Sequence, residues 1–342
     1  MRFPLCVSAK SALYTLTAAI AGMFLLGAAA SASTTIYTAD EEQGTVTILD
    51  LDKGPLATIP VGVSPHNVDV TPDGRLLLVV GVAAHSGMQM QGMGAMGALV
   101  LVDIAGDKPV IRAEIAVAQH PAHVVPSPDS TRAFVTDAVA NAVVVVDLQT
   151  RAVVGRVPVG SSPHGLRLSP DGKTLAVANM KDGTVSIIDT ASLTERSRIA
   201  VGRKPVQVGF TPDGRQLLVS LNGEDRLAIL DVASGRVTQK VRVGRGPIQV
   251  FATADQKSAL VANQGTRQRP DDRVCLVPLD RPGTVQHIVT GAGAHGVTLS
   301  PDGKLAFITN TVANTMSVID VASATVLRSW PTGKAPNGVV AR

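Results

Sequence analysis

The chain has 342 residues with 31 basic and 27 acidic side chains, and aromatic residues make up only 3% of it. A formal charge of +4 and so few aromatic rings argue against a protein built to hold polyanions or to stack nucleic-acid bases, so we expect no nucleic-acid partner. Apolar residues reach 45%, which is enough for a large buried core.

The first 32 residues have the pattern of a secretory signal peptide. Basic residues precede a mostly apolar stretch, residues 11–29, and Ala30-Ser31-Ala32 forms a small-residue cleavage site. We therefore expect residues 33–342 to be exported, to the periplasm or beyond, with no membrane anchor after cleavage. An uncleaved membrane anchor is the alternative interpretation of the same segment.

Beyond the leader, the sequence repeats itself with a period of 42 residues. Four copies have this length: 117–158, 159–200, 201–242 and 289–330. Two further copies are longer, with 56 residues in 61–116 and 46 residues in 243–288. A period near 40 with several short apolar strands in each unit is typical of a propeller.

Two separate landmarks each count seven units. A proline, or alanine in one copy, precedes the first apolar strand at Pro65, Pro121, Pro163, Pro205, Pro247, Ala294 and Pro336. An aspartate ends a later apolar strand at Asp50, Asp103, Asp147, Asp189, Asp231, Asp280 and Asp320. The chain also starts and stops in mid-repeat, because residues 35–60 supply three strands and the C-terminal PNGVVAR supplies one first strand. We predict an all-β, seven-bladed β-propeller with four antiparallel strands per blade, one blade being closed by the C-terminal strand.

The repeat pattern VGxxPHxVxxSPDGxxLxVxNxxxxxVxVID resembles the YVTN-type β-propeller family of exported bacterial proteins. Residues 159–200 follow it almost throughout, and the resemblance covers about 35–342. The family is similar to the propeller domains of cd-type nitrite reductases and related proteins that hold a modified haem. The resemblance implies ligand chemistry at one mouth of the central channel, but no single activity, because members include binding proteins, haem-site proteins and lactone-cleaving enzymes.

Histidines gather at one mouth of the expected channel. The first strand of each blade lines the channel, so the residues beside the proline all lie on one face. The position directly after the proline holds His66, His164 and His295, while His120 and His123 flank the proline of another blade. An alternative interpretation is that each histidine only forms hydrogen bonds with a neighbouring blade.

The longest insertion emerges on the same face as these histidines. It lies between the second and third strands of repeat 61–116, reads AAHSGMQMQGMGAMG, and contributes His85, Met88, Met90, Met93 and Met96. Thioether sulfur beside imidazole suits soft metals, above all Cu(I), and a flexible Met-rich loop can wrap an ion. The predicted metal site therefore comprises His66, His85, Met88, Met90, Met93, Met96, His120, His123, His164 and His295.

Three functions remain open at this stage. The first is an exported, monomeric binding protein that holds copper or another small ligand at the His/Met mouth. The second is a redox or hydrolytic enzyme that uses the same histidines with a bound metal or a haem-type cofactor. The third is a ligand-free scaffold that binds a protein partner. The sequence shows no nucleophile elbow, phosphate loop or haem-attachment motif that would choose among them.

Overall fold

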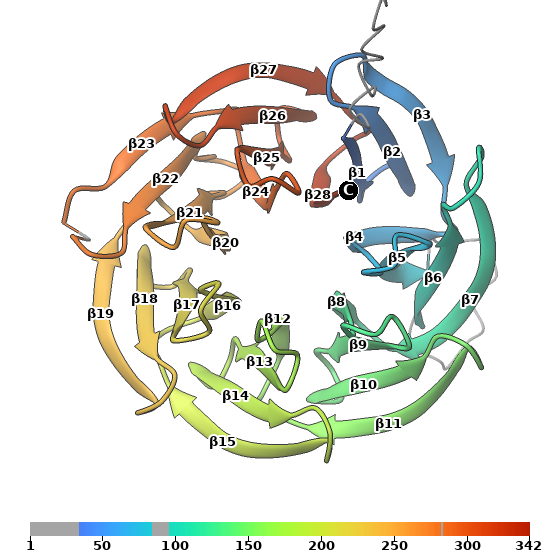
Figure 1. Cartoon of the computed structure of the whole chain (residues 1–342), viewed down its shortest axis with the longest axis horizontal. Helices are drawn as coiled ribbons and strands as arrows, with labels where there is room; N and C mark the ends of the chain where they lie inside the picture. The colour runs from blue at the N-terminus through green and yellow to red at the C-terminus, as the bar shows by residue number, and fades with distance from the viewer. Residues whose placement is uncertain (1–33, 84–95, 282) are drawn as a thin grey trace, which may run out of the picture. The chain divides into compact units, whose positions relative to one another are not determined.

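The computed structural model describes residues 34–83, 96–281 and 283–342, and these form a ring of seven four-stranded sheets around a central channel (Figure 1). The predicted fold class is confirmed. Among the described residues there is no helix, and so none that could cross a membrane. The predicted leader, residues 1–32, lies outside the described residues, so its role stays a prediction.

Each blade is a four-stranded antiparallel meander, in which successive strands lie farther from the channel (Figure 1). Blade 2 consists of β4 (Val63–Val70), β5 (Leu76–Ala83), β6 (Gly97–Asp103) and β7 (Val110–Ala118). Blade 3 consists of β8 (Pro121–Pro126), β9 (Arg132–Asp137), β10 (Ala142–Asp147) and β11 (Ala152–Pro158). Blade 4 consists of β12 (Pro163–Leu168), β13 (Thr174–Asn179), β14 (Thr184–Asp189) and β15 (Thr194–Ala200).

The next three blades repeat this arrangement. Blade 5 consists of β16 (Pro205–Phe210), β17 (Gln216–Leu221), β18 (Arg226–Asp231) and β19 (Arg236–Arg242). Blade 6 consists of β20 (Pro247–Ala252), β21 (Ser258–Asn263), β22 (Arg273–Pro278) and β23 (Gln286–Val289). Blade 7 consists of β24 (Ala294–Leu299), β25 (Leu305–Asn310), β26 (Thr315–Asp320) and β27 (Thr325–Pro331).

Blade 1 closes the ring as the mid-repeat ends predict. Its strands are β28 (Pro336–Ala341), β1 (Thr35–Asp40), β2 (Thr45–Asp50) and β3 (Gly54–Pro60), in that order across the sheet. The C-terminal strand β28 pairs antiparallel with β1, with Tyr37 opposite Val340 and Thr38 opposite Val339. The first and last parts of the sequence thus share one sheet, which leaves no unpaired inner edge at the junction.

The core is divided into clusters between neighbouring blades. Seven hydrophobic clusters are found among the described residues, and each draws its side chains from two adjacent blades. One of them, for example, packs Ile36 and Leu49 of blade 1 against Phe307 and Met316 of blade 7. Because the two faces of each sheet are buried against different neighbours, the strands read as nearly continuous apolar runs.

Turns of the SPDG type join the first and second strands of blades 2 to 7, on the face opposite the histidines. In blade 4 the turn joins the end of β12 to β13: Ser169 Oγ donates to Asp171 Oδ1 at 2.6 Å, and Gly172 has φ +70°. In blade 3 the glycine is replaced by Ser130, which adopts the same left-handed region at φ +60°. Asn, Asp and Gly tolerate this region best. The blade 3 turn, SPDS at residues 127–130, therefore keeps the backbone conformation of an SPDG turn at some cost in strain.

One sequence landmark differs from the structure. The third strand of blade 6, β22, ends at Pro278, two residues before the predicted Asp280. Proline has no N–H with which to continue the ladder, so the pairing stops there. In the other six blades the predicted aspartate is the last residue of the third strand.

Candidate metal site at the channel mouth

The inner wall of the ring is made of the seven first strands (Figure 1). In every blade the pairing of the first strand with the second shifts register directly after the proline position. Such a bulge breaks the strict alternation of side chains and re-aims them. Two successive residues after the proline can therefore face the channel, which explains how histidines from both positions meet there.

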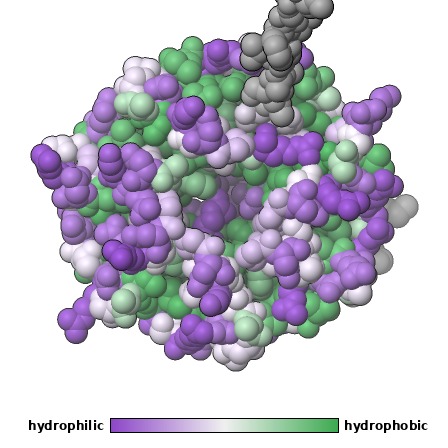
Figure 2. Space-filling model, viewed as in Figure 1, coloured by the Kyte–Doolittle hydropathy of each residue, from purple (hydrophilic) through white to green (hydrophobic). Residues whose placement is uncertain are grey.

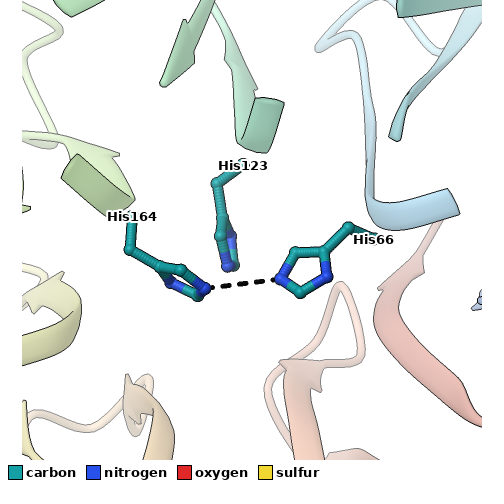
Figure 3. A group of neighbouring side chains, drawn as sticks. All are labelled: His66, His123 and His164. Atoms are coloured by element: carbon teal, nitrogen blue, oxygen red, sulfur yellow. Dashed lines mark hydrogen bonds between the residues drawn. The ribbon is translucent and has the colours of Figure 1, made fainter. Parts of the chain in front are cut away.

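Three histidines from consecutive blades converge in the channel mouth. They are His66 on β4, His123 on β8 and His164 on β12, and one ring nitrogen of each lies within 4.8 Å of the others (Figure 3). His66 Nε2 and His164 Nε2 are 3.4 Å apart. A tetrahedral ion with metal–nitrogen bonds of about 2.0–2.1 Å requires ligand nitrogens roughly 3.4 Å apart. The spacing fits a transition-metal ion held by imidazoles.

The outer nitrogens of two of these rings are held by neighbouring groups. His66 Nδ1 lies 3.2 Å from Glu41 Oε1, and Asn337 donates to Glu41 Oε2 at 2.6 Å. His164 Nδ1 lies 3.2 Å from the carbonyl oxygen of Val206 in the next blade. An Nδ1–H held by a carboxylate or a carbonyl leaves the Nε2 lone pair free, which is the arrangement found behind many metal-bound histidines.

His123 is the most deeply placed of the three. Its side chain is 1% exposed, and its Nε2 has no hydrogen-bond partner among the described residues. Gln207 Nε2 lies 3.4 Å from His123 Nδ1, while Gln207 Oε1 accepts from Val208 N. A buried nitrogen without a partner is costly unless a ligand satisfies it. To bind an ion through Nε2, His123 must carry its proton on Nδ1, so the Gln207 amide has to turn over.

A glycine and a hydroxyl hold this arrangement in place. A Cβ on Gly165 would overlap the Gln207 side chain and lie 2.6 Å from the carbonyl oxygen of Val206, so only glycine leaves room for the amide. Thr136 Oγ1 accepts from His123 N at 3.0 Å and donates to His164 O at 2.8 Å. The hydroxyl therefore fixes the spacing between the two histidine-bearing strands.

The electrostatics keep His123 and His164 neutral, which is the state that binds metal. Burial, and then repulsion from His164 and His66, lowers the pKa of His123 well below its ordinary value. Burial, and then repulsion from His66 and His295, lowers the pKa of His164 to about 3. Burial alone would raise the pKa of Glu41, but His66 and Asn337 outweigh it and bring that pKa to about 2. Glu41 is thus the negative charge beside the site.

The other predicted site residues fall into three groups. His295 lies beside the three histidines, with its ring centroid 6.4 Å from that of His66, but it is not part of the ligand group. His120 is exposed and lines a pocket of about 380 Å³ together with Glu41, His66 and Ala83. Met96 is described and 46% exposed. His85, Met88, Met90 and Met93 lie outside the described residues, so their part in the site stays a prediction.

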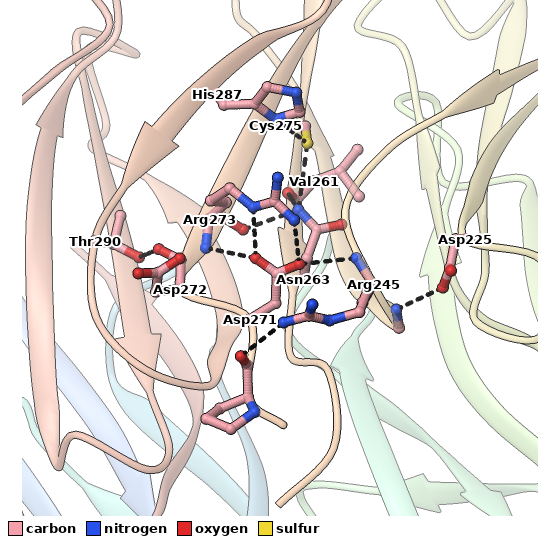
Figure 4. A network of polar contacts seen from close by, with 12 residues as sticks. Asp225, Arg245, Val261, Asn263, Asp271, Asp272, Arg273, Cys275, His287 and Thr290 are labelled. Carbon is pink, nitrogen blue, oxygen red and sulfur yellow. Dashed lines mark hydrogen bonds and ion pairs between the residues drawn. The ribbon is translucent and has the colours of Figure 1, made fainter. Parts of the chain in front are cut away.

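The second insertion, between β21 and β22, is anchored by an aspartate (Figure 4). Asp271 is 1% exposed and accepts hydrogen bonds from the Arg273 side chain and from Arg245 N. Arg267 in this loop forms a 2.6 Å ion pair with Glu42, the residue after Glu41, although both side chains are largely exposed. The loop thus contacts the segment that carries the carboxylate of the candidate site.

Several residues of the site were not predicted from the sequence. Glu41, Gln207 and Gly165 contact the histidines or make room for their partners, yet none carries a motif. Asn337 occupies the histidine position of blade 1, and that placement was the one available signal. These contacts join residues of different blades, so the pattern within a single repeat does not predict them.

Comparisons with known proteins agree with the fold. Residues 174–243 and 216–342 match the family model described as YNCE-like beta-propeller, so this part of the chain is similar to that family. No curated protein sequence matches the chain. Hydrazine synthase of Kuenenia stuttgartiensis superposes with a TM-score of 0.69 at 22% identity, covering 81% of this chain and 89% of that one.

A second solved structure is a functionally unknown protein from Desulfotomaculum acetoxidans. It superposes with a TM-score of 0.73 at 15% identity and covers 90% of this chain and 98% of its own. At these identities the likenesses show the propeller fold alone. The relation to haem-holding propellers suggested by the repeat pattern stays a prediction.

Proposed function

We propose that this protein is an exported metal-binding β-propeller that holds a copper ion at His66, His123 and His164. The observation that carries the proposal is the convergence of three imidazoles from three consecutive blades, with ring nitrogens within 4.8 Å of one another. The partnerless Nε2 of buried His123 and the Glu41 carboxylate behind His66 support it.

The Met-rich insertion favours copper over other metals. Imidazole alone suits zinc, copper, iron and nickel, whereas thioether sulfur favours Cu(I). The insertion leaves the blade after Ala83, and Ala83 lines the same pocket as His66 and His120. A copper ion at the histidines would therefore lie near Ala83, the last described residue before the insertion that carries Met88, Met90, Met93 and Met96. Export is inferred from residues 1–32.

A second candidate is a metal-dependent enzyme at the same site. Three protein ligands leave a coordination position open, which is the pattern of catalytic rather than structural metal sites. The same three histidines support this candidate function. A carrier and an enzyme share the metal-binding step, so that step is tested first.

The test is a metal titration of the exported chain. Cu(I) is titrated against a competing chelator, and Cu(II) and Zn(II) are titrated separately, into three proteins: wild type, a His66→Ala/His123→Ala/His164→Ala variant, and a variant with all four loop methionines changed to leucine. We expect one high-affinity ion in wild type and none in the histidine variant. The methionine variant should lose affinity for Cu(I) while keeping its affinity for Zn(II).

Other outcomes would overturn the proposal in distinct ways. Equal affinity in wild type and in the histidine variant would remove the channel site. Unchanged Cu(I) affinity in the methionine variant would remove the argument for copper but leave a metal site. No binding of any ion by wild type would favour the ligand-free scaffold.

A further inference from the structure

Arg167 lies farther along the channel-lining strand β12 than His164 does. It lies on β12, three residues after His164, and its guanidinium carbon is 5.9 Å from the ring centroid of Phe251, two blades onward. Its charge also acts on Asp69 of β4, two blades back, and on His123 of β8. A charge that acts on Asp69 and His123 on one side while lying over Phe251 on the other belongs to a side chain that faces the central channel.

The guanidinium of Arg167 has few partners for its hydrogen-bond donors. It carries five N–H groups, yet within the described part of the chain its one hydrogen bond runs from Nη1 to Leu166 O at 3.4 Å. Asp69 acts on it only through its charge, because the Asp69 carboxylate instead accepts from Val70 N at 2.8 Å. A guanidinium inside a protein is ordinarily paired with an anion.

A second unpartnered donor lies on β20, the first strand of blade 6, which also carries Phe251. Gln249 on β20 is 2% exposed, and its Nε2 has no hydrogen-bond partner among the described residues. It occupies the second position after the proline, as do His123 and Gln207, which meet across the inner rim. Gln249 is also two residues before Phe251, the ring that Arg167 covers. Both unsatisfied groups are hydrogen-bond donors, so they fit an acceptor ligand.

The centre of the ring is hollow (Figure 2). Arg167 and Asp69 each keep part of their surface accessible although protein surrounds them, as the lining of a narrow channel does. Figure 2 shows the ring hollowed at its centre, with hydrophilic surface inside the hollow. The facing charge of Asp69 limits what can enter, because a multiply charged anion would be repelled more strongly than a monoanion.

We propose that Arg167 and the Gln249 amide bind a small monovalent oxyanion, of the size and charge of a simple carboxylate, inside the channel. The guanidinium fork matches the two oxygens of a carboxylate. Phe251 lies over one face of the guanidinium, which leaves the N–H edge free for a ligand. This site goes beyond the proposed metal binding and does not require a bound metal.

The experiment measures acetate binding to the metal-free protein at constant ionic strength, from the broadening of the acetate NMR signal. Wild type is compared with Arg167→Met, Arg167→Lys and Gln249→Leu, and with Arg203→Met as a control that removes an exposed arginine from the same face. We expect saturable binding in wild type and in the control. Arg167→Met should weaken it at least roughly tenfold, and the other two variants should weaken it less.

Thermal melting separates a binding role from a structural one. If Arg167 is kept for a ligand, removing its poorly paired charge leaves the melting temperature of the ligand-free ring unchanged or raises it. No saturable acetate binding by wild type, or equal binding by Arg167→Met, would overturn the proposal. Should Arg167→Met fail to fold, Arg167→Lys decides, because it keeps the charge and loses the fork.

A zinc-loaded arm separates this proposal from the metal site. An anion at Arg167 offsets the positive charge near His123, so zinc and acetate should each tighten the binding of the other. Acetate binding without zinc binding would uphold the oxyanion site and reject the metal. Zinc binding with no acetate binding would do the reverse.

Discussion

The channel mouth and the outer part of blade 6 both place soft or nitrogen donors in contact, with different results. At the mouth, His66 and His164 bring two Nε2 atoms to 3.4 Å and a third histidine joins them. In blade 6, Cys275 Sγ lies 3.2 Å from His287 Nδ1, across the β22–β23 pair (Figure 4). Asn263 Nδ2 also contacts this sulfur at 3.3 Å.

The difference lies in how the donors are brought together. The Cys275–His287 pair comes from one sheet, and burial raises the pKa of the Cys275 thiol, so it keeps its proton and donates it locally. The mouth histidines come from three blades, and the buried Nε2 of His123 is left without a partner. Histidines that converge from three blades form a group that could hold a metal ion, whereas the Cys275–His287 pair within one blade satisfies the hydrogen-bonding groups of its two members.

The largest expected effect comes from removing one mouth ligand. His123→Ala should lower metal affinity by more than about 100-fold, beyond the roughly 10–100-fold that the loss of an outer partner costs. Cys275→Ala and His287→Ala should leave the affinity unchanged. Competition titration of the purified variants gives the three values, and a loss confined to the blade 6 variants would reverse the comparison.

Gly165 tests whether the mouth depends on tight space. Gly165→Ala forces a Cβ against the Gln207 side chain and the Val206 carbonyl, and should cost roughly 1–3 kcal/mol of the free energy of unfolding. Gly106→Ala is the matched control, because nothing lies within 4 Å of its added Cβ. Chemical denaturation compares them. Equal stability of the two variants would show that the rim can relax around the change.

His295 tests the electrostatics of the mouth. Burial, and then repulsion from His66, lowers its pKa to about 3, whereas an unfolded histidine titrates near 6.5. Between these values the unfolded chain binds the extra proton, so stability falls as the pH drops from 6.5 toward 3. His295→Gln should remove about 2 kcal/mol of the loss between pH 6.5 and 5. His287→Gln, which removes an exposed histidine outside the mouth, is the control variant.

The smallest expected effect comes from the carboxylate behind His66. Glu41→Gln keeps the shape but removes the charge, so metal affinity should fall about tenfold. Glu42→Gln is the control, since Glu42 pairs with Arg267 rather than with a histidine. An equal loss in both variants would mean that only the overall charge of the face matters.

The ring could be predicted from the sequence because its signals are local and repeated. The proline position recurs in six of seven blades and the SPDG-type turn in blades 2 to 7. The mid-repeat ends bound the array, and β28 pairs with β1 as they indicate. The mouth histidines after Pro65 and Pro163 were also predicted, since equivalent positions share a face. Which three rings meet was not predicted, because that depends on the bulges and on contacts between blades, such as those of Gln207 and Gly165.

The most direct test of the central claim is a crystal structure of the copper-loaded protein, with an anomalous difference map collected at the copper absorption edge. The account predicts one strong peak within bonding distance of ring nitrogens of His66, His123 and His164, with Glu41 behind His66. A strong peak at Cys275 and His287, or no peak at the channel mouth of a protein shown to bind one copper ion, would contradict it.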